Sequence, residues 1–342
     1  MIVSLGVSQH LAACLDSLAS HDSRDSFRVV WVNNDPGAKP SAAPVLPDEV
    51  LRVDVTTNLG WAGGLHVGRA HLDSEYLVWV QDDMQVAPGW LDALMTAADA
   101  HPDIAAFGSL AMLDDGRLDG PSGGRALPHD DVARWNDHDA AAGTPPTELT
   151  RHDWVTGKGM LTRVAAWDEV HGTDPRQFPL NHVDKDYFTH LRAHGYSVAL
   201  VPGARLTHVG SASSPSQFRL FLPPWQEPRF NARWGGPVAA MDAAPGPVAH
   251  ECSAWLPEPS DPARILEHVR RAVGDEASRM LIPAVRWTSS AHLKEVEDRA
   301  HAFMLVEIGA SEQRFVTSAS WRVTAPLRAA AELLRRLRRS GR

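Results

Sequence analysis

A short apolar segment followed by two acids most constrains how this chain can fold. Residues 75–91 read Glu-Tyr-Leu-Val-Trp-Val-Gln-Asp-Asp-Met-Gln-Val-Ala-Pro-Gly-Trp-Leu. The apolar run Tyr76–Val80 predicts a strand buried on both faces, and the proline-glycine pair predicts a turn into a helix. Ligands of open α/β sheets bind beyond the carboxyl ends of strands, so Asp82 and Asp83 stand where a divalent cation and the phosphates it carries would bind. A solvated turn is the alternative for this pair taken alone.

Strands and helices alternate through the first two thirds of the chain. Predicted strands are Ile2–Val7, Phe27–Val32, Leu51–Val55, Ile104–Met112 and Val198–Val201, and predicted helices include Leu91–Ala100 and Asp184–His194. This alternation predicts a largely parallel sheet with helices on both faces. Residues 114–153 lack either periodicity and predict a long functional or mobile loop.

Composition and charge restrict the class of protein. The chain has 342 residues, of which 44% are hydrophobic; none of its apolar runs is long enough to cross a membrane, and no signal peptide is expected at Met1. Its two cysteines form no CxxC pair, which favours a reducing cytoplasm over a disulfide framework or a zinc site. The net charge of -9 argues against general binding of nucleic acid.

Three segments are predicted along the chain. Residues 1–235 carry the alternating pattern, 236–323 form a linker and an accessory region, and 324–342 form a basic amphipathic helix. That tail has six arginines from Arg328 to Arg342 against the single acid Glu332. It could lie on an anionic membrane surface, or pack its leucine face on its own domain or on a second subunit, so an oligomer is also possible.

Four segments together resemble the family-2 glycosyltransferases, particularly rhamnosyltransferase-like and galactofuranosyltransferase-like members. They are Val29–Asn34, Asn58–Gly64, Gln81–Leu91 and Val183–Ser211. The resemblance implies an α/β GT-A nucleotide-sugar-binding fold, a mostly parallel sheet with helices on both faces, followed here by a mixed α/β C-terminal extension. It also implies transfer of a sugar from a nucleotide-diphosphate donor, with inversion, to a glycan or polyprenyl-linked acceptor in assembly of cell-envelope polysaccharide.

The resemblance assigns residues to the metal and to the general base. Asp83 is the expected metal ligand, with Asp82 and His208 beside it, and Mn²⁺ or Mg²⁺ is the expected cofactor. Neutral imidazole favours Mn²⁺ over Mg²⁺. The acceptor hydroxyl needs a base because its pKa is that of an alcohol, and the matching carboxylate is Asp184. Val183 stands where the family commonly has an acid.

The resemblance also implies residues for the two substrates. Expected to bind the nucleotide-sugar are Asn33, Asn58, Gly60, Gly63, Gly64, Gln81 and Asp82. Expected to bind the acceptor are Trp154, Lys158, His182 and Asp186. Each has a structural alternative: turn residues for the asparagines and glycines, core packing for Trp154, and acids that favour a helix N-terminus for Asp184 and Asp186.

Two other functions remain open from the sequence. Gln81 and Val183 depart from the family pattern, which leaves a catalytically silent scaffold or glycan-binding protein as an alternative. A nucleotidyltransferase is the other, although the basic signature loop that it needs does not occur between Ser4 and Leu18. The cytoplasm is the expected location, with a peripheral position at the inner face of the cell membrane if the tail binds lipid.

Overall fold

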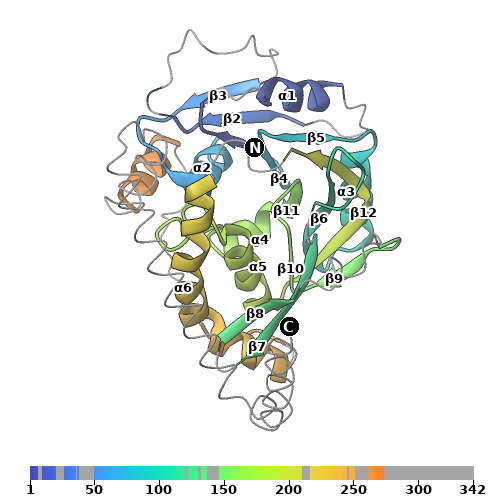
Figure 1. The fold of residues 1–342 in the computed structure, drawn as a ribbon, viewed down its shortest axis with the longest axis vertical. Coiled ribbons are helices and arrows are strands. Elements are labelled where there is room, and N and C mark those ends of the chain that lie inside the picture. Colours follow the sequence, from blue (N-terminus) through green and yellow to red (C-terminus); the bar gives the residue numbers. More distant parts are fainter. Residues whose placement is uncertain are drawn as a thin grey trace, which may run out of the picture. The chain divides into compact units, whose positions relative to one another are not determined.

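The acidic pair follows a central strand of the large sheet in the computed structural model. This sheet has nine strands, and their order is β3-β2-β1-β4-β11-β6-β12-β5, with β9 pairing beside β12 (Figure 1). The strands are β1 (Ile2–Ser4), β2 (Val29–Asn33), β3 (Val50–Asp54), β4 (Tyr76–Gln81), β5 (Met84–Val86), β6 (Ile104–Met112), β9 (Thr150–His152), β11 (Met160–Arg163) and β12 (Ser197–His208). The structure describes residues 1–6, 10–20, 27–35, 37, 50–119, 122–129, 132–136, 146–209, 216–244, 246–250 and 262–272.

The strands from the first part of the chain pair with one another in parallel. β3, β2, β1 and β4 run parallel, and so do β6 and β12. β11 lies antiparallel between β4 and β6, and β5 and β9 are antiparallel to β12. A smaller sheet has the order β10-β7-β8 and is formed by β7 (Gly123–His129), β8 (Val132–Asn136) and β10 (Trp154–Val155). The predicted α/β class is confirmed.

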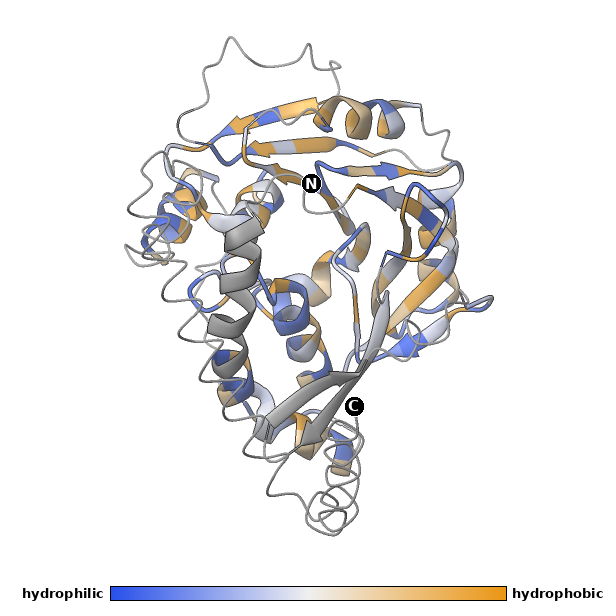
Figure 2. Ribbon diagram, viewed as in Figure 1, coloured by the Kyte–Doolittle hydropathy of each residue, from blue (hydrophilic) through white to orange (hydrophobic). Residues whose placement is uncertain are grey.

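Helices cover both faces of the large sheet, as the alternation predicted. They are α1 (Leu11–Ala19), α2 (Gly60–Arg69), α3 (Trp90–Ala100), α4 (Val164–Glu169), α5 (Val183–Ala193) and α6 (Ser216–Ala243). Two hydrophobic cores result, one containing α1 and α3 and the other α2, α4 and α5. Neighbouring residues of β4 alternate between them, since Trp79 belongs to the second core and Val80 to the first. Long hydrophobic stretches along the strands are visible in Figure 2.

Strand β12 is longer than predicted. The sequence predicts a strand that ends before Pro202-Gly203, but one strand runs from Ser197 to His208. The register with β6 shifts between Val201 and Arg205, so the proline falls at an irregularity. Proline lacks a backbone N–H and is tolerated in a sheet at such a bulge. The continued strand carries His208 to the edge of the sheet where the acidic pair lies.

The glycine cluster is part of helix α2 and does not precede it. Gly60 has φ +69°, and a Cβ there would lie 2.3 Å from the carbonyl oxygen of Pro179. A Cβ on Gly64 would lie 2.4 Å from Cγ1 of Val3. Both glycines therefore allow backbone to approach closely, with α2 packed directly on β1.

Helix α6 continues through the boundary predicted at residue 235. Its buried residues Phe230, Trp234 and Val238 join the core that contains α5. The described residues all belong to one compact unit that spans residues 1–286, whereas the predicted tail 324–342 lies outside the described residues. The three-segment division stays a prediction, with α6 spanning its first boundary. No helix in the described ranges is long and apolar enough to cross a membrane.

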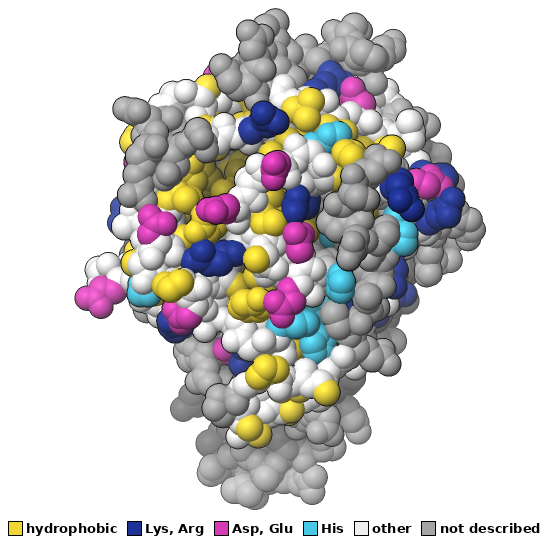
Figure 3. All heavy atoms as spheres, turned by 180° about the vertical axis from the view of Figure 1, so that it is seen from behind, with side chains coloured by type: hydrophobic (Ala, Val, Ile, Leu, Met, Phe, Trp, Pro, Cys, Tyr) yellow, Lys and Arg dark blue, Asp and Glu magenta, His cyan; other side chains and the backbone are white. Residues whose placement is uncertain are grey.

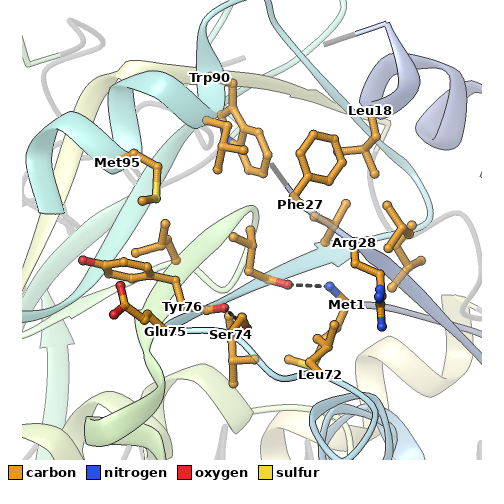
Figure 4. Close-up of a pocket in the computed structure, with 17 residues that line it drawn as sticks. Met1, Leu18, Phe27, Arg28, Leu72, Ser74, Glu75, Tyr76, Trp90 and Met95 are labelled. Atoms are coloured by element: carbon orange, nitrogen blue, oxygen red, sulfur yellow. Dashed lines mark hydrogen bonds between the residues drawn. The ribbon is translucent and has the colours of Figure 1, made fainter. Parts of the chain in front are cut away.

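An apolar cavity of about 290 Å³ lies toward the amino ends of β2 and β4. Side chains such as Leu18, Phe27 and Tyr76 line it, and the Met1 ammonium group donates a 2.7 Å hydrogen bond to the carbonyl oxygen of Val78 (Figure 4). The acidic pair follows the opposite, carboxyl end of β4, so this cavity is separate from the site described next.

Candidate functional site

The sheet brings together acids and a histidine from three separate parts of the chain. β12 pairs with β5 in a register that places His208 opposite Met84, and the N–H of Val209 donates to the carbonyl oxygen of Asp83 at 3.0 Å. The carboxyl ends of β6 and β12 meet because the two strands are parallel neighbours. The chain turns after β6 and returns Asp119 to the same place, where its N–H donates to the carbonyl oxygen of Ala111 at 2.9 Å.

A line of polar contacts joins these residues. Nδ1 of His208 donates a short hydrogen bond to Oδ2 of Asp119, which also accepts from Nζ of Lys158 at 2.6 Å. On its other side, Nε2 of His208 lies 3.3 Å from Oδ1 of Asp83. His208 and Asp83 are almost completely buried, with side-chain exposures of 5% and 3%. The predicted neighbourhood of Asp83 and His208 is therefore present in the fold.

Burial and charge oppose each other at His208. Burial lowers the pKa of His208, but the hydrogen bond to Asp119 and the nearby Asp83 carboxylate raise it more, so the net shift is upward. For Asp119, burial raises the pKa, whereas His208 and Lys158 together lower it to about 2. Asp119 is therefore an anion at neutral pH.

The residues present fit one open metal site. Nε2 of His208 is buried and has no hydrogen-bond partner, and a carboxylate oxygen lies beside it. Imidazole nitrogen and carboxylate oxygen are both ligands for Mn²⁺, and the carboxylate also suits Mg²⁺. No group of three or more His, Cys, Asp or Glu side chains able to hold a metal occurs in the described part of the chain. The pair thus fits a cation that takes further ligands from a bound substrate.

Asp82 and Gln81 lie near Cys14 of α1. Burial raises the pKa of the Cys14 thiol to about 12, and the charges of Asp82 and Asp83 add to this shift, so both carboxylates lie near α1. The backbone oxygen of Gln81 lies 3.6 Å from the Cys14 sulfur, and the Gln81 side chain is half-buried. Of the two carboxylates, that of Asp83 has its Oδ1 3.3 Å from Nε2 of His208.

Asp184 lies at the start of α5, where the residues between β10 and β11 contact it. Its Oδ2 accepts a 3.1 Å hydrogen bond from the N–H of Gly157, and its Oδ1 accepts from its neighbour Lys185 at 2.9 Å. A Cβ on Gly157 would lie 2.7 Å from Trp61 and 3.2 Å from the Cβ of Asp184. Asp184 is half-buried, and Lys158, the residue after Gly157, pairs with Asp119, the partner of His208.

The predicted nucleotide-sugar residues lie at the carboxyl ends of β2 and β3, mostly within structural contacts. Nδ2 of Asn33 donates to Oδ1 of Asp54 at 2.6 Å. Oδ1 of Asn58 accepts from the N–H of Gly60 at 2.9 Å and from Nδ2 of Asn34 at 3.1 Å. Asn34, which the sequence did not single out, thus fixes the entry to α2. Gly63, like Gly60 and Gly64, is buried in α2.

The predicted acceptor residues do not form one group. Trp154 is buried in the core, with the ammonium group of Lys185 5.2 Å from its ring centroid, and Lys158 pairs with Asp119. His182 packs between two phenylalanine rings, and burial followed by the charge of Lys185 lowers its pKa to about 4. Asp186 is fully buried and accepts a 2.8 Å hydrogen bond from the indole N–H of Trp234. Asp186 therefore connects α5 to α6.

Asp119 is the site residue that sequence reasoning missed. It lies in the segment 114–153, which showed no periodic pattern. The available signal was the turn Asp114-Asp115-Gly116, which directly follows a correctly predicted strand and sends the chain back along it.

Figure 3 shows the side of the molecule opposite to the view of Figure 1. Acidic and basic side chains are interspersed among the described residues on this side.

Known proteins resemble the chain in both sequence and fold. Residues 1–155 match the family described as "Glycosyl transferase family 2". N-acetylglucosaminyl-diphospho-decaprenol L-rhamnosyltransferase of Mycobacterium tuberculosis (strain CDC 1551 / Oshkosh) is 26% identical over 232 residues, which cover 60% of this chain and 74% of that protein. The protein of the same name from strain ATCC 25618 / H37Rv gives the same values.

A solved structure shares the fold. The crystal structure of GalNAc-T7 with UDP, GalNAc and Mn²⁺ superposes with a TM-score of 0.50 at 13% sequence identity, over 79% of this chain. The chain spans about half, 54%, of the length of that structure. Together with the sheet order, these similarities identify residues 1–155 as a family-2 glycosyltransferase domain, and the chain as a glycosyltransferase with the GT-A fold.

Proposed function

We propose that this glycosyltransferase moves a sugar from a nucleotide-diphosphate donor to a glycan or polyprenyl-linked acceptor, with inversion at the anomeric carbon. One observation carries the proposal. Gly157 bonds the carboxylate of Asp184, and the adjacent Lys158 bonds Asp119, which bonds His208 of the buried pair Asp83–His208. The candidate metal ligands and the candidate base are thus connected through two consecutive residues and Asp119.

Asp83 and His208 would hold a divalent cation, because the buried Nε2 of His208 lies 3.3 Å from Oδ1 of Asp83, where one ion could contact both atoms. A bound Mn²⁺ or Mg²⁺ would offset the negative charge that develops on the leaving diphosphate. Imidazole as a ligand favours Mn²⁺, and the GalNAc-T7 structure contains that ion. Asp82, Gln81 and Asn33 are proposed for the nucleotide side because they follow strands β4 and β2 at the same edge.

Asp184 is proposed to act as the general base. Two backbone N–H groups fix its carboxylate and keep it half-buried beside the loop that precedes β11. The carboxylate would accept the proton of the acceptor hydroxyl while that oxygen bonds to the anomeric carbon. The bond from that carbon to the diphosphate breaks on the opposite face, so the configuration inverts.

The M. tuberculosis relatives indicate which acceptor to test first. Their name specifies an N-acetylglucosaminyl-diphospho-decaprenol acceptor and an L-rhamnosyl group. We propose the same chemical class here, a polyprenyl-diphosphate-linked amino sugar. Trp154, Lys158, His182 and Asp186 remain predictions as acceptor residues, and Lys158 bonds Asp119, the partner of His208.

The test is direct transfer with defined substrates. Purified full-length protein is incubated with Mn²⁺, a synthetic prenyl-diphosphate-linked N-acetylglucosamine and UDP-, GDP- or dTDP-sugars in turn, and the products are measured by mass spectrometry. NMR of the product gives its anomeric configuration. Transfer with inversion that disappears in Asp83→Asn and Asp184→Asn supports the proposal. Retained configuration, or full activity of Asp184→Asn, would contradict it.

A further inference from the structure

We propose that Asp119 is a positioning residue, which orients the imidazole of His208 so that Nε2 faces Asp83 and the donor's cation, and that Lys158 holds Asp119 in place. The inference rests on the proposed function, since it concerns the same histidine. It adds Asp119 to the site and assigns Lys158 the task of holding Asp119.

A hairpin that follows β6 returns the chain to the site at Asp119. After β6, the N–H of Leu113 donates to the carbonyl oxygen of Arg117 at 2.8 Å, and the N–H of Gly116 donates to Leu113 at 2.9 Å. The hairpin is therefore closed by its own hydrogen bonds. Asp119 then rejoins the sheet edge through its N–H bond to Ala111, next to the end of β12.

The hydrogen bond to Asp119 selects one tautomer of His208. A carboxylate only accepts hydrogen bonds, so Nδ1 of His208 must carry the proton that it donates to Asp119. In the neutral imidazole, Nε2 is then unprotonated and presents its lone pair 3.3 Å from Oδ1 of Asp83. A histidine that binds a metal through one nitrogen commonly donates its other N–H to a carboxylate, which fixes the orientation of the ring.

Lys158 keeps Asp119 as a partner of the histidine. Its ammonium group bonds both the side-chain Oδ2 and the backbone oxygen of Asp119, at 2.6 Å and 3.2 Å. Oδ2 is thus shared by the imidazole and the ammonium group, which anchors the carboxylate on the far side of His208 from Asp83. This geometry favours a positioning role for Asp119 over a role as a third metal ligand.

The first experiment reads the tautomer of His208 without any metal. Full-length protein labelled with ¹⁵N is studied by NMR at alkaline pH, with the His208 signals assigned by their loss in His208→Gln. Wild type and the control Asp115→Ala, on the same hairpin, should show Nδ1–H and a bare Nε2. Asp119→Ala should shift His208 toward the Nε2–H form. An unchanged tautomer in Asp119→Ala, or Nε2–H in wild type, overturns the inference.

The second experiment measures binding of Mn²⁺ alone, from the EPR signal of the free ion. Asp119→Ala should bind Mn²⁺ about 10–100-fold more weakly than wild type, the usual effect of losing a partner behind a metal ligand. Asp115→Ala should bind normally, and Asp119→Asn, which keeps an oxygen acceptor, should lie between. Asp119→Asn also serves if Asp119→Ala does not fold, as judged by circular dichroism.

The two experiments separate failure of the inference from failure of the proposed function. If His208→Ala binds Mn²⁺ as tightly as wild type, the metal assignment in the proposed function is wrong, while the tautomer experiment still decides the role of Asp119. If His208→Ala weakens binding but neither Asp119 variant does, the proposed function stands and the positioning role is overturned.

Discussion

The backbone N–H of Gly157 donates a 3.1 Å hydrogen bond to the carboxylate of Asp184. The next residue, Lys158, pairs with Asp119, the partner of His208. One short connection before β11 therefore contacts both the proposed base and Asp119, the hydrogen-bond partner of His208. No side chain fits at Gly157, because a Cβ would press on Trp61 and on Asp184 itself. The relative placement of base and metal ligand thus depends on this glycine.

Replacing Asp184 by asparagine tests the base. The amide oxygen can still accept the hydrogen bond from Gly157, so the fold and donor affinity should be kept, while proton abstraction is lost. We expect kcat to fall about 10²–10⁴-fold, the usual contribution of a positioned base. Initial rates give kcat, and thermal shifts with donor check binding. A loss confined to KM would instead assign Asp184 to acceptor binding.

Replacing Asp83, one of the two proposed metal ligands, tests whether transfer depends on a bound metal ion. We expect Asp83→Asn to lower kcat/KM at least about 100-fold, equivalent to about 2.7 kcal/mol of transition-state stabilisation. Chelation of wild type should abolish transfer and added Mn²⁺ should restore it. Asp115→Asn is the matched control, because Asp115 forms an exposed pair with Arg117 on the hairpin beside the site. Transfer that survives chelation contradicts a metal role.

Gly64→Ala should destabilise the protein by overpacking α2 against β1. The added Cβ would lie 2.4 Å from Cγ1 of Val3, within a buried contact. Such insertions typically cost about 1–3 kcal/mol. Urea unfolding measures the loss, and the second change Val3→Ala should recover part of it. Gly236→Ala in α6 is the control, since nothing lies within 4 Å of its new Cβ, and a helical alanine should be neutral or stabilising.

Asp186 should make stability fall as pH rises through mildly acidic values. Burial raises its pKa to about 6, although the charge of Arg233 opposes this, whereas an aspartate in the unfolded chain titrates near about 3.9. Between these values the folded protein binds more protons than the unfolded chain, so the free energy of unfolding decreases with increasing pH.

Asp186→Asn removes that contribution, so its free energy of unfolding should decrease less over the same pH interval. Urea unfolding at a series of pH values compares it with wild type. Asp242→Asn, which changes a pair with Arg192 between the same two helices, is the control. Parallel stability profiles for wild type and Asp186→Asn would show that Asp186 does not titrate in this range.

Deletion of residues 324–342 tests the membrane interpretation of the tail. Each basic residue near an anionic surface contributes about 1 kcal/mol, so the five net positive charges read from the sequence suffice for reversible binding. Full-length protein should bind vesicles that contain anionic lipid, less so at high salt, and the truncated chain should not. Equal binding by both chains, or binding indifferent to salt, argues for a helix that packs on protein.

Local sequence patterns predicted those parts of the fold that depend on neighbours in the chain. Leu77 and Trp79 bury one face of β4, the other face is half-buried at Tyr76 and Val78 and buried at Val80, and β6 has the predicted bounds Ile104–Met112. The N-terminal acids of α5 and its end before Gly195 also follow from helix chemistry. Asp83 and His208 could be paired in advance only through the family resemblance, because each looks like an ordinary surface residue in its own segment.

Tertiary structure alone decided which side chains meet. Asp119 reaches His208, 89 positions away in sequence, because β6 and β12 are parallel neighbours, and strand register is set by pairing between distant segments. Likewise, the family resemblance assigns Gly60 and Gly64 to the nucleotide-sugar, whereas in the fold they pack closely against Pro179 and Val3. The sequence by itself determined an alternating sheet with acids at its carboxyl edge. Only the folded chain decided that Asp83 contacts His208, that Asp186 faces α6, and that Gly157 holds Asp184, since these contacts depend on packing that no local pattern encodes.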